Sequence, residues 1–222
     1  MKNYSTDCIL KILTGYLLLI LSFVTTANAQ FTFDTTITAD QLVNKFLLGQ
    51  GMRIGNVTYS GSKSSIGYFK ADNNAIGVES GILLSTGKVT DANGPNNSPW
   101  TTTSFTPVKS KTRPKGDRDL NRISKSVTYD ASILEFDFIP FNNRITFSYV
   151  FGSEEYMEWV GSSFNDVFAL WISGPGIVGL VNLATIPGGN LPVTQANINC
   201  TIGNGNYYVC NDPTNTFCNA SY

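Results

Sequence analysis

The sequence contains no histidine. This absence removes the usual general base near neutral pH, the Ser-His and Cys-His nucleophile pairs, and the common zinc and copper ligands. Catalysis in this chain would have to use carboxylates, lysine, tyrosine or a metal that is held by oxygen atoms.

Charge is also scarce, since only 14% of the 222 residues are charged and 15 basic residues against 16 acidic ones give a net charge of −1. The sequence has neither a basic stripe nor an acidic tail, so we expect no nucleic-acid partner. Aromatic residues make up 12% of the chain, which excludes a disordered protein and provides material for a core.

Long apolar runs are absent except near the amino terminus, where Lys2 precedes an apolar stretch that is densest over residues 16–24. The stretch ends in Ala27-Asn28-Ala29, a small-residue cleavage pattern, and is shorter than the roughly 20 residues that a bilayer requires. We therefore predict a signal peptide over residues 1–29, cleavage near Ala29, and an exported mature chain without a transmembrane segment.

Cleavage would remove Cys8 and leave an odd number of cysteines: Cys200, Cys210 and Cys218. In an oxidising compartment, a disulfide between two of them is favoured over zinc binding by all three. Either one thiol stays free or the chain stops before its partner, and the pairing is left open.

The rest of the chain, residues 30–222, is predicted to form one domain. A short helix is expected near its start, because Thr38 and Gln41 form a capping box before an apolar stripe that ends at Gly49. Five apolar runs punctuated by Gly, Pro, Asn and Ser predict strands: 82–84, 133–139, 145–151, 167–172 and 177–186. We therefore expect a mainly β protein, an antiparallel β-sandwich of jelly-roll or lectin-like type.

In two of these runs, 133–139 and 145–151, apolar residues recur at every second position, from Leu134 to Phe138 and from Ile145 to Phe151. They are predicted to be neighbouring strands with Phe-rich inner faces. Between residues 86 and 126 hydrophobic residues are sparse, which predicts a long central loop.

Four motifs carry a family resemblance: Leu134–Phe138, Tyr149–Tyr156, Phe164–Phe168 and Ile172–Gly176. In these stretches the sequence resembles the choice-of-anchor L domain of bacterial surface and secreted proteins. The match runs in order over nearly all of the mature chain, with Gly152 where the family usually has Ala.

The resemblance implies an exported domain whose parent proteins are attached to the cell surface by varied carboxy-terminal signals, and no such signal appears here. It also implies that the domain continues past the Cys-rich segment, so the chain is expected to be incomplete at its carboxy-terminal end. The family brings no established biochemical activity that can be carried over.

Acidic residues cluster in the motif stretches, which suggests a cation that relieves their repulsion. Calcium takes six to eight oxygen ligands in irregular geometry, and magnesium is the weaker candidate. The predicted ligands are Asp117, Asp119, Glu154, Glu155, Asn165 and Asp166. The alternative is that these acids pair with nearby arginines or cap turns.

We predict a noncatalytic secreted or cell-surface module for adhesion or for binding a glycan or protein, with Trp100, Tyr156 and Trp159 as candidate ligand-binding aromatics. The alternative is a carbohydrate-active hydrolase in which Glu154 or Glu155 acts as acid and Asp166 as base or nucleophile.

Overall fold

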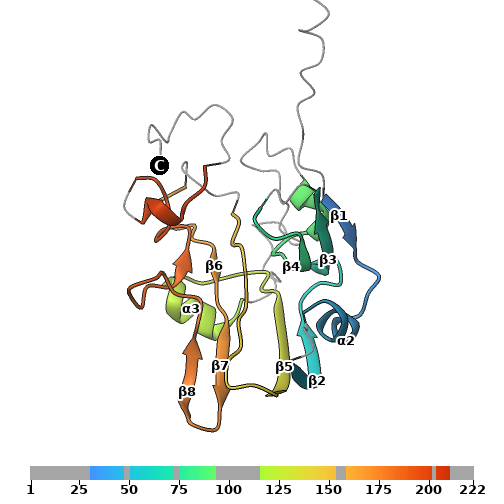
Figure 1. The fold of residues 1–222 in the computed structure, drawn as a ribbon. Coiled ribbons are helices and arrows are strands. Elements are labelled where there is room, and N and C mark those ends of the chain that lie inside the picture. The colour runs from blue at the N-terminus through green and yellow to red at the C-terminus, as the bar shows by residue number, and fades with distance from the viewer. Residues whose placement is uncertain are drawn as a thin grey trace, which may run out of the picture. The chain divides into compact units, whose positions relative to one another are not determined.

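The structure, a computed structural model, describes residues 31–47, 51–72, 76–93, 116–153, 159–201 and 204–210 (Figure 1). All of them belong to one compact unit that begins at Phe31. The described chain is mainly antiparallel β structure in several small sheets, consistent with a β-sandwich, so the predicted fold class is confirmed.

The first sheet has the order β1-β3-β4, formed by β1 (Phe31–Asp34), β3 (Ile66–Ala71) and β4 (Ser80–Leu84). Both pairings are antiparallel, and β4 contains the predicted run 82–84. The central strand β3 is the most deeply buried strand of this sheet, with four of its six residues buried.

The predicted helix is present as α2 (Ala39–Leu42), which continues as the π-helix η1 (Val43–Leu47). Thr38 caps its start, and both halves of the capping box with Gln41 are formed, which satisfies backbone donors that the first turn leaves unpaired. Leu42 and Val43 are fully buried, and α2 contacts β2 and β3.

The second sheet pairs β2 (Met52–Ser60) with β5 (Ile133–Pro140), antiparallel, with an irregularity between Gly55 and Thr58. In β5 the predicted alternation is confirmed, because Glu135 and Asp137 are exposed whereas the apolar residues between them are half-buried.

The prediction that residues 145–151 form the neighbouring strand of β5 is wrong. Residues 144–153 form no strand, and β2 occupies the position beside β5. The alternating pattern instead reflects partial burial of a segment that is not a strand, in which Ile145 and Phe147 are half-buried while Thr146 and Ser148 are exposed. Tyr149 on this segment packs against Phe168, with 4.9 Å between ring centroids.

The predicted central loop contains helical structure in its described parts. The 3₁₀ helix η3 (Val89–Asn93) and the helix α3 (Arg118–Ser124) lie in it, so the described chain has two short α-helices where the sequence indicated one. Residues 94–115 lie outside the described residues.

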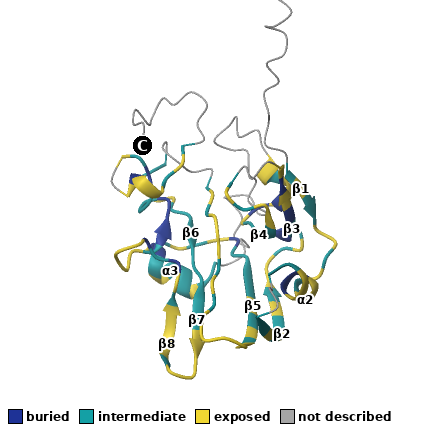
Figure 2. Cartoon of the chain, in the orientation of Figure 1, coloured by how far each residue is buried: buried dark blue, intermediate teal, exposed yellow. Residues whose placement is uncertain are grey.

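The carboxy-terminal part consists of two short antiparallel pairs and one helical turn. β6 (Val167–Phe168) pairs with β9 (Val193–Thr194), and β7 (Trp171–Gly174) pairs with β8 (Ile177–Asn182). The 3₁₀ helix η4 (Gly205–Tyr207) follows. Figure 2 shows that β8 is largely exposed, whereas β3 is mostly buried.

No helix in the described ranges combines the length and apolar character needed to cross a bilayer.

Candidate functional site

The acidic residues at the start of α3 have structural partners. Asp117 is the N-cap, and its Oδ1 accepts hydrogen bonds from the backbone N–H groups of Asp119 and Leu120 at 2.8 and 2.9 Å. Asp119 forms an ion pair with Arg122 at 3.2 Å, and the Arg122 guanidinium lies 5.7 Å from the ring centroid of Trp171. A hollow of about 480 Å³ against α3 is lined by these two ion-paired residues together with Arg118 and Asn121.

The turn before α3 is held by Thr128. The N–H of Gly116 donates to the carbonyl of Thr128 at 2.9 Å, and the N–H of Asp117 donates to its hydroxyl at 3.2 Å. Asn121 accepts hydrogen bonds from both the N–H and the hydroxyl of Thr128. Asp117 and Asp119 therefore lie at the start of a helix, and Thr128 holds the turn that leads into it.

Asn165 connects two distant parts of the chain. Its amide nitrogen donates to the carbonyl of Ser124 at 3.2 Å, and its amide oxygen accepts from the N–H of Ala196 at 3.1 Å. Ser124 is the last residue of α3 and Asp117 caps its start, and a seven-residue helix spans about 10 Å. Asp117 and Asn165, two of the predicted calcium ligands, therefore lie at opposite ends of α3.

Asp166 is the carboxylate with the strongest sign of a special environment. Its Oδ2 accepts a hydrogen bond from the hydroxyl of Ser153 at 2.8 Å, and its backbone carbonyl accepts from Gln195 at 3.2 Å. Burial raises the pKa of Asp166 above its ordinary value, and the Ser153 hydrogen bond opposes that shift. This environment disfavours a bare carboxylate in the absence of a positive partner.

Several predicted site residues lie outside the described residues: Trp100, Glu154, Glu155, Tyr156 and Cys218. Among the residues that are described, no group of three or more Asp, Glu or Cys side chains is placed to hold a metal ion. The calcium site and the two-carboxylate hydrolase site therefore remain predictions.

Trp159 is the described member of the predicted aromatic set. It is half-buried, and its ring meets that of Phe164 edge to face, with 5.0 Å between centroids. This geometry indicates packing between neighbouring parts of one loop.

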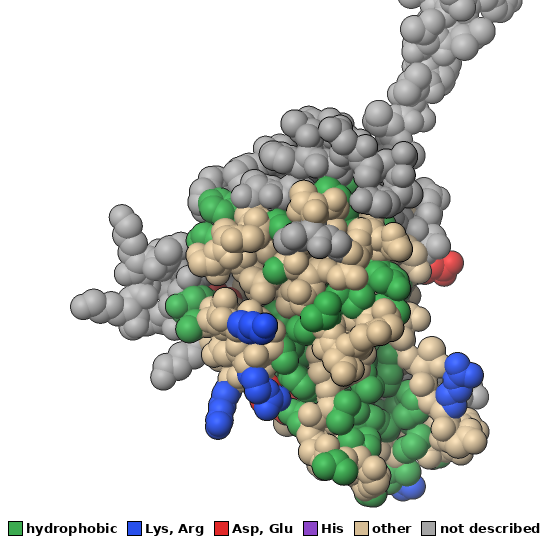
Figure 3. All heavy atoms as spheres, turned by 90° about the vertical axis from the view of Figure 1, so that its left-hand side faces the viewer, with side chains coloured by type: hydrophobic (Ala, Val, Ile, Leu, Met, Phe, Trp, Pro, Cys, Tyr) green, Lys and Arg blue, Asp and Glu red, His purple; other side chains and the backbone are tan. Residues whose placement is uncertain are grey.

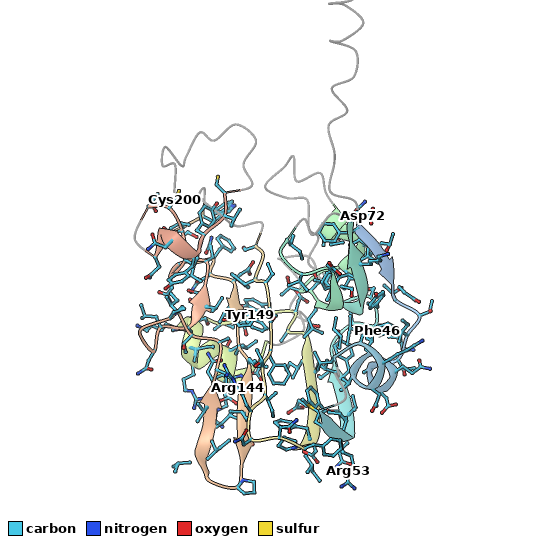
Figure 4. The ribbon with its side chains drawn as sticks, in the orientation of Figure 1. Phe46, Arg53, Asp72, Arg144, Tyr149 and Cys200 are labelled. Atoms are coloured by element: carbon cyan, nitrogen blue, oxygen red, sulfur yellow. The ribbon has the colours of Figure 1, made fainter. Side chains whose placement is uncertain are left out.

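The two described cysteines differ. Cys210 is a free thiol and is half-buried, whereas Cys200, labelled in Figure 4, is not a free thiol.

Sequence reasoning missed an apolar groove of about 350 Å³ between the segment after β5 and the β7–β8 pair. Its apolar walls come from Pro140, Ile145, Phe147, Ile172 and Leu183, and two asparagines of the turn after β5 complete it. Figure 4 labels Arg144 and Tyr149 on the segment that forms one wall. Figure 3 shows hydrophobic side chains gathered on the face that includes β8, with Lys and Arg at its margins.

One sequence feature could have indicated this surface. Residues 167–210 contain no Lys, Arg, Asp or Glu, although many of them are exposed. Charged side chains normally cover the solvent side of a sheet, so their complete absence over 44 residues marks a surface with another use.

The described part of the chain thus combines small antiparallel sheets with an apolar groove whose lining is uncharged. The chain belongs to the Choice-of-anchor L domain family, whose model matches residues 28–222. Members of this family are modules of cell-surface or secreted proteins. The chain has no significant match among curated proteins or among solved structures.

Proposed function

We propose that this chain is a noncatalytic, ligand-binding module of an exported protein and that it binds a protein ligand through the apolar groove. The observation that carries the proposal is the groove itself, a concave surface of about 350 Å³ with Ile145, Phe147, Ile172 and Leu183 in its walls. Binding sites are typically concave and mostly apolar, with a few polar groups that fix orientation.

The composition of the groove favours a protein ligand over a glycan. Glycans are held by aromatic platforms and hydrogen-bonding side chains, and the groove offers one aromatic ring and two asparagine side chains. Apolar side chains of a protein ligand would instead gain free energy in proportion to the area that they bury.

The test is to apply the secreted chain in parallel to an array of immobilised 15-residue peptides of varied apolar and charged content and to an array of oligosaccharides. We expect binding to uncharged, apolar-rich peptides and at least tenfold weaker binding for Leu183→Lys. Val127→Lys is the matched control, because Val127 is 66% exposed but does not line the groove. Binding confined to oligosaccharides, or binding that Leu183→Lys leaves unchanged, would contradict the proposal.

A second proposal is that calcium stabilises the loop around Asp166. It is supported by the buried Asp166 carboxylate, which accepts a hydrogen bond from the Ser153 hydroxyl. Ser153 directly precedes Glu154 in the sequence, and Glu154 is another of the predicted calcium ligands. An ion that binds only the folded chain raises its melting temperature as the ion concentration rises. We expect such a rise with calcium for the parent chain and for Glu135→Gln, an exposed carboxylate on β5, and its loss in Asp166→Asn. Equal melting in calcium and in chelator would refute this site.

The same oligosaccharide array tests the hydrolase alternative. Shortened oligosaccharides in the presence of the parent chain, absent with Asp166→Asn, would replace the noncatalytic proposal.

We further propose that cleavage after Ala29 yields an exported chain in which Cys200 forms a disulfide. The support is that Cys200 is not a free thiol while Cys210 is. Amino-terminal sequencing of the secreted chain should give Gln30 first, and peptide mapping without reduction should find Cys200 in a cross-linked pair. A start at Met1 or an alkylatable Cys200 would contradict these points.

A further inference from the structure

The strand β8 exposes three apolar side chains. Val178 is 96% exposed, Leu180 is 44% exposed and Val181 is 39% exposed. The residue that follows the strand, Leu183, is 47% exposed. Single exposed hydrophobic residues are ordinary, but a contiguous set is rare on monomeric proteins and marks an interaction surface.

The exposed residues of β8 and the groove form one continuous surface. Leu183, which directly follows β8, lines the groove, and Val181 of β8 is paired across the ladder with Ile172, which also lines it. An exposed apolar strand and an apolar hollow therefore adjoin each other on the same molecule.

Charge restricts the chemistry of the occupant. The groove lining contains no charged residue, and β8 lies inside the 44-residue stretch without charge. A charged partner would lose its hydration there without gaining an ion pair. The occupant must be uncharged and apolar, and β8 of this same chain, with the sequence IVGLVN, meets that requirement.

The edge of β8 is not suited to regular strand addition. Gly179 has a φ of 74°, and the register between β7 and β8 shifts between Ile172 and Gly174. A bulged edge interrupts a regular hydrogen-bond ladder and protects against edge pairing. The contact is therefore expected to use side chains rather than a continued sheet.

We propose that a second copy of this chain docks on this surface, with β8 of each copy packed against the groove of the other across a two-fold axis. A two-fold contact uses the same patch twice, so the exposed strand of each copy can cover the groove of the other. Because the patch is uncharged, the axis brings no like charges together. This inference rests on the proposed function, since it identifies the protein ligand of the groove as the chain itself.

Sedimentation velocity of the secreted chain between about 1 and 200 µM tests the proposal. We expect a concentration-dependent dimer, with a dissociation constant raised at least tenfold by Val178→Lys, since each substitution enters the contact twice. Because Val178 is almost wholly exposed, its replacement should leave the fold intact, as the melting temperature can verify. Val127→Lys, an exposed valine outside the groove lining, should dimerise like the parent.

A disulfide through the free thiol of Cys210 is another route to a dimer, so every variant is measured in a Cys210→Ser background. A chain that stays monomeric up to 200 µM, or a dimer that Val178→Lys and Leu183→Ser leave unchanged, overturns the proposal. Monomeric chain that still binds peptides on the array would overturn the dimer while leaving the proposed function standing. Failure of both assays would overturn both.

Discussion

Two regions of this chain use their hydrophobic residues in opposite ways. Residues 31–93 contain five basic and five acidic residues, and they supply six of the nine buried hydrophobic residues that the structure describes. Residues 167–210 contain no charged residue, yet Val178, Leu180, Leu183 and Leu191 there are exposed.

The difference shows that hydrophobic composition alone does not locate a core. In the first region, charges mark the solvent side, and the apolar residues between them are buried by α2 and the β1-β3-β4 sheet. In the second region nothing in the side-chain chemistry separates inside from outside. Its exposed apolar surface is then best explained by the binding role proposed above.

The largest expected effect tests this contrast directly. Leu42 is fully buried beside β2 and β3, so Leu42→Ala should lower the free energy of unfolding by about 2–5 kcal/mol. Leu180 is 44% exposed, so Leu180→Ala should cost less than about 1 kcal/mol. Urea unfolding of the two variants measures both values. A similar decrease in the free energy of unfolding for both variants would mean that β8 is buried in solution. The two regions would then not differ in how they use their hydrophobic residues.

The segment between the two regions offers a glycine test. A Cβ on Gly116 would collide with the backbone and side chain of Thr128, which also accepts the Gly116 hydrogen bond. Gly116→Ala should therefore destabilise the chain by about 1–3 kcal/mol, the usual cost of overpacking.

Gly152 provides the matched control, because a Cβ there meets nothing within 4 Å. Gly152→Ala should be neutral or stabilising by up to about 1 kcal/mol, through the reduced freedom of the unfolded chain. Thermal melts show which substitution lowers the melting temperature more. An equal change at the two positions would contradict the close contact between Gly116 and Thr128.

What the sequence could predict follows from local chemistry. The capping box at Thr38 and Gln41 depends on residues three apart, and the alternation in β5 depends on neighbours, so both were predictable. Residues 145–151 lie outside any strand but have the same alternation as β5, and only the distant β2 decides which of the two runs becomes a strand. Likewise, the role of Asn165 depends on Ser124 and Ala196, which are 41 and 31 residues away along the chain.

Asp166 is the last charged residue before the uncharged region. The pH dependence of stability tests how this residue differs from the uncharged residues that follow it. Burial raises its pKa in the folded chain, so the folded state holds the proton more tightly than the unfolded state. Its effect on stability is therefore absent below the unfolded pKa of about 3.9, and becomes unfavourable as pH rises through the folded pKa.

Asp166→Asn, measured in chelator, should accordingly raise the melting temperature at pH 7 by a few degrees and give no advantage near pH 3. One kcal/mol corresponds to about 2–4 °C in a chain of this size. Glu135→Gln, which removes an exposed carboxylate on β5, is the control variant. A melting curve of Asp166→Asn that runs parallel to the parent at every pH would show that Asp166 is not desolvated in solution.

The smallest effect is expected where a charge from outside the uncharged region touches it. Arg122 lies over Trp171 of β7 and pairs with Asp119, but its side chain is 62% exposed and that of Asp119 is 39% exposed. Exposed ion pairs contribute roughly 0–1 kcal/mol, and exposed cation–π contacts about 0.5–1 kcal/mol. Arg122→Ala should therefore lower the free energy of unfolding by about 1 kcal/mol or less, and Asp119→Ala by less than that.

Arg122→Lys separates the two contacts of Arg122. Lysine keeps the positive charge that pairs with Asp119 but loses the planar group that stacks on Trp171. Salt screens the ion pair, whereas the contact with the indole face depends mainly on packing. Thermal melts of the three variants at low salt and at 1 M salt separate the contributions. If the melting temperature of Arg122→Lys stays below that of the parent at high salt, the stabilisation comes from the contact with Trp171. If the difference vanishes at high salt, it comes from the ion pair with Asp119.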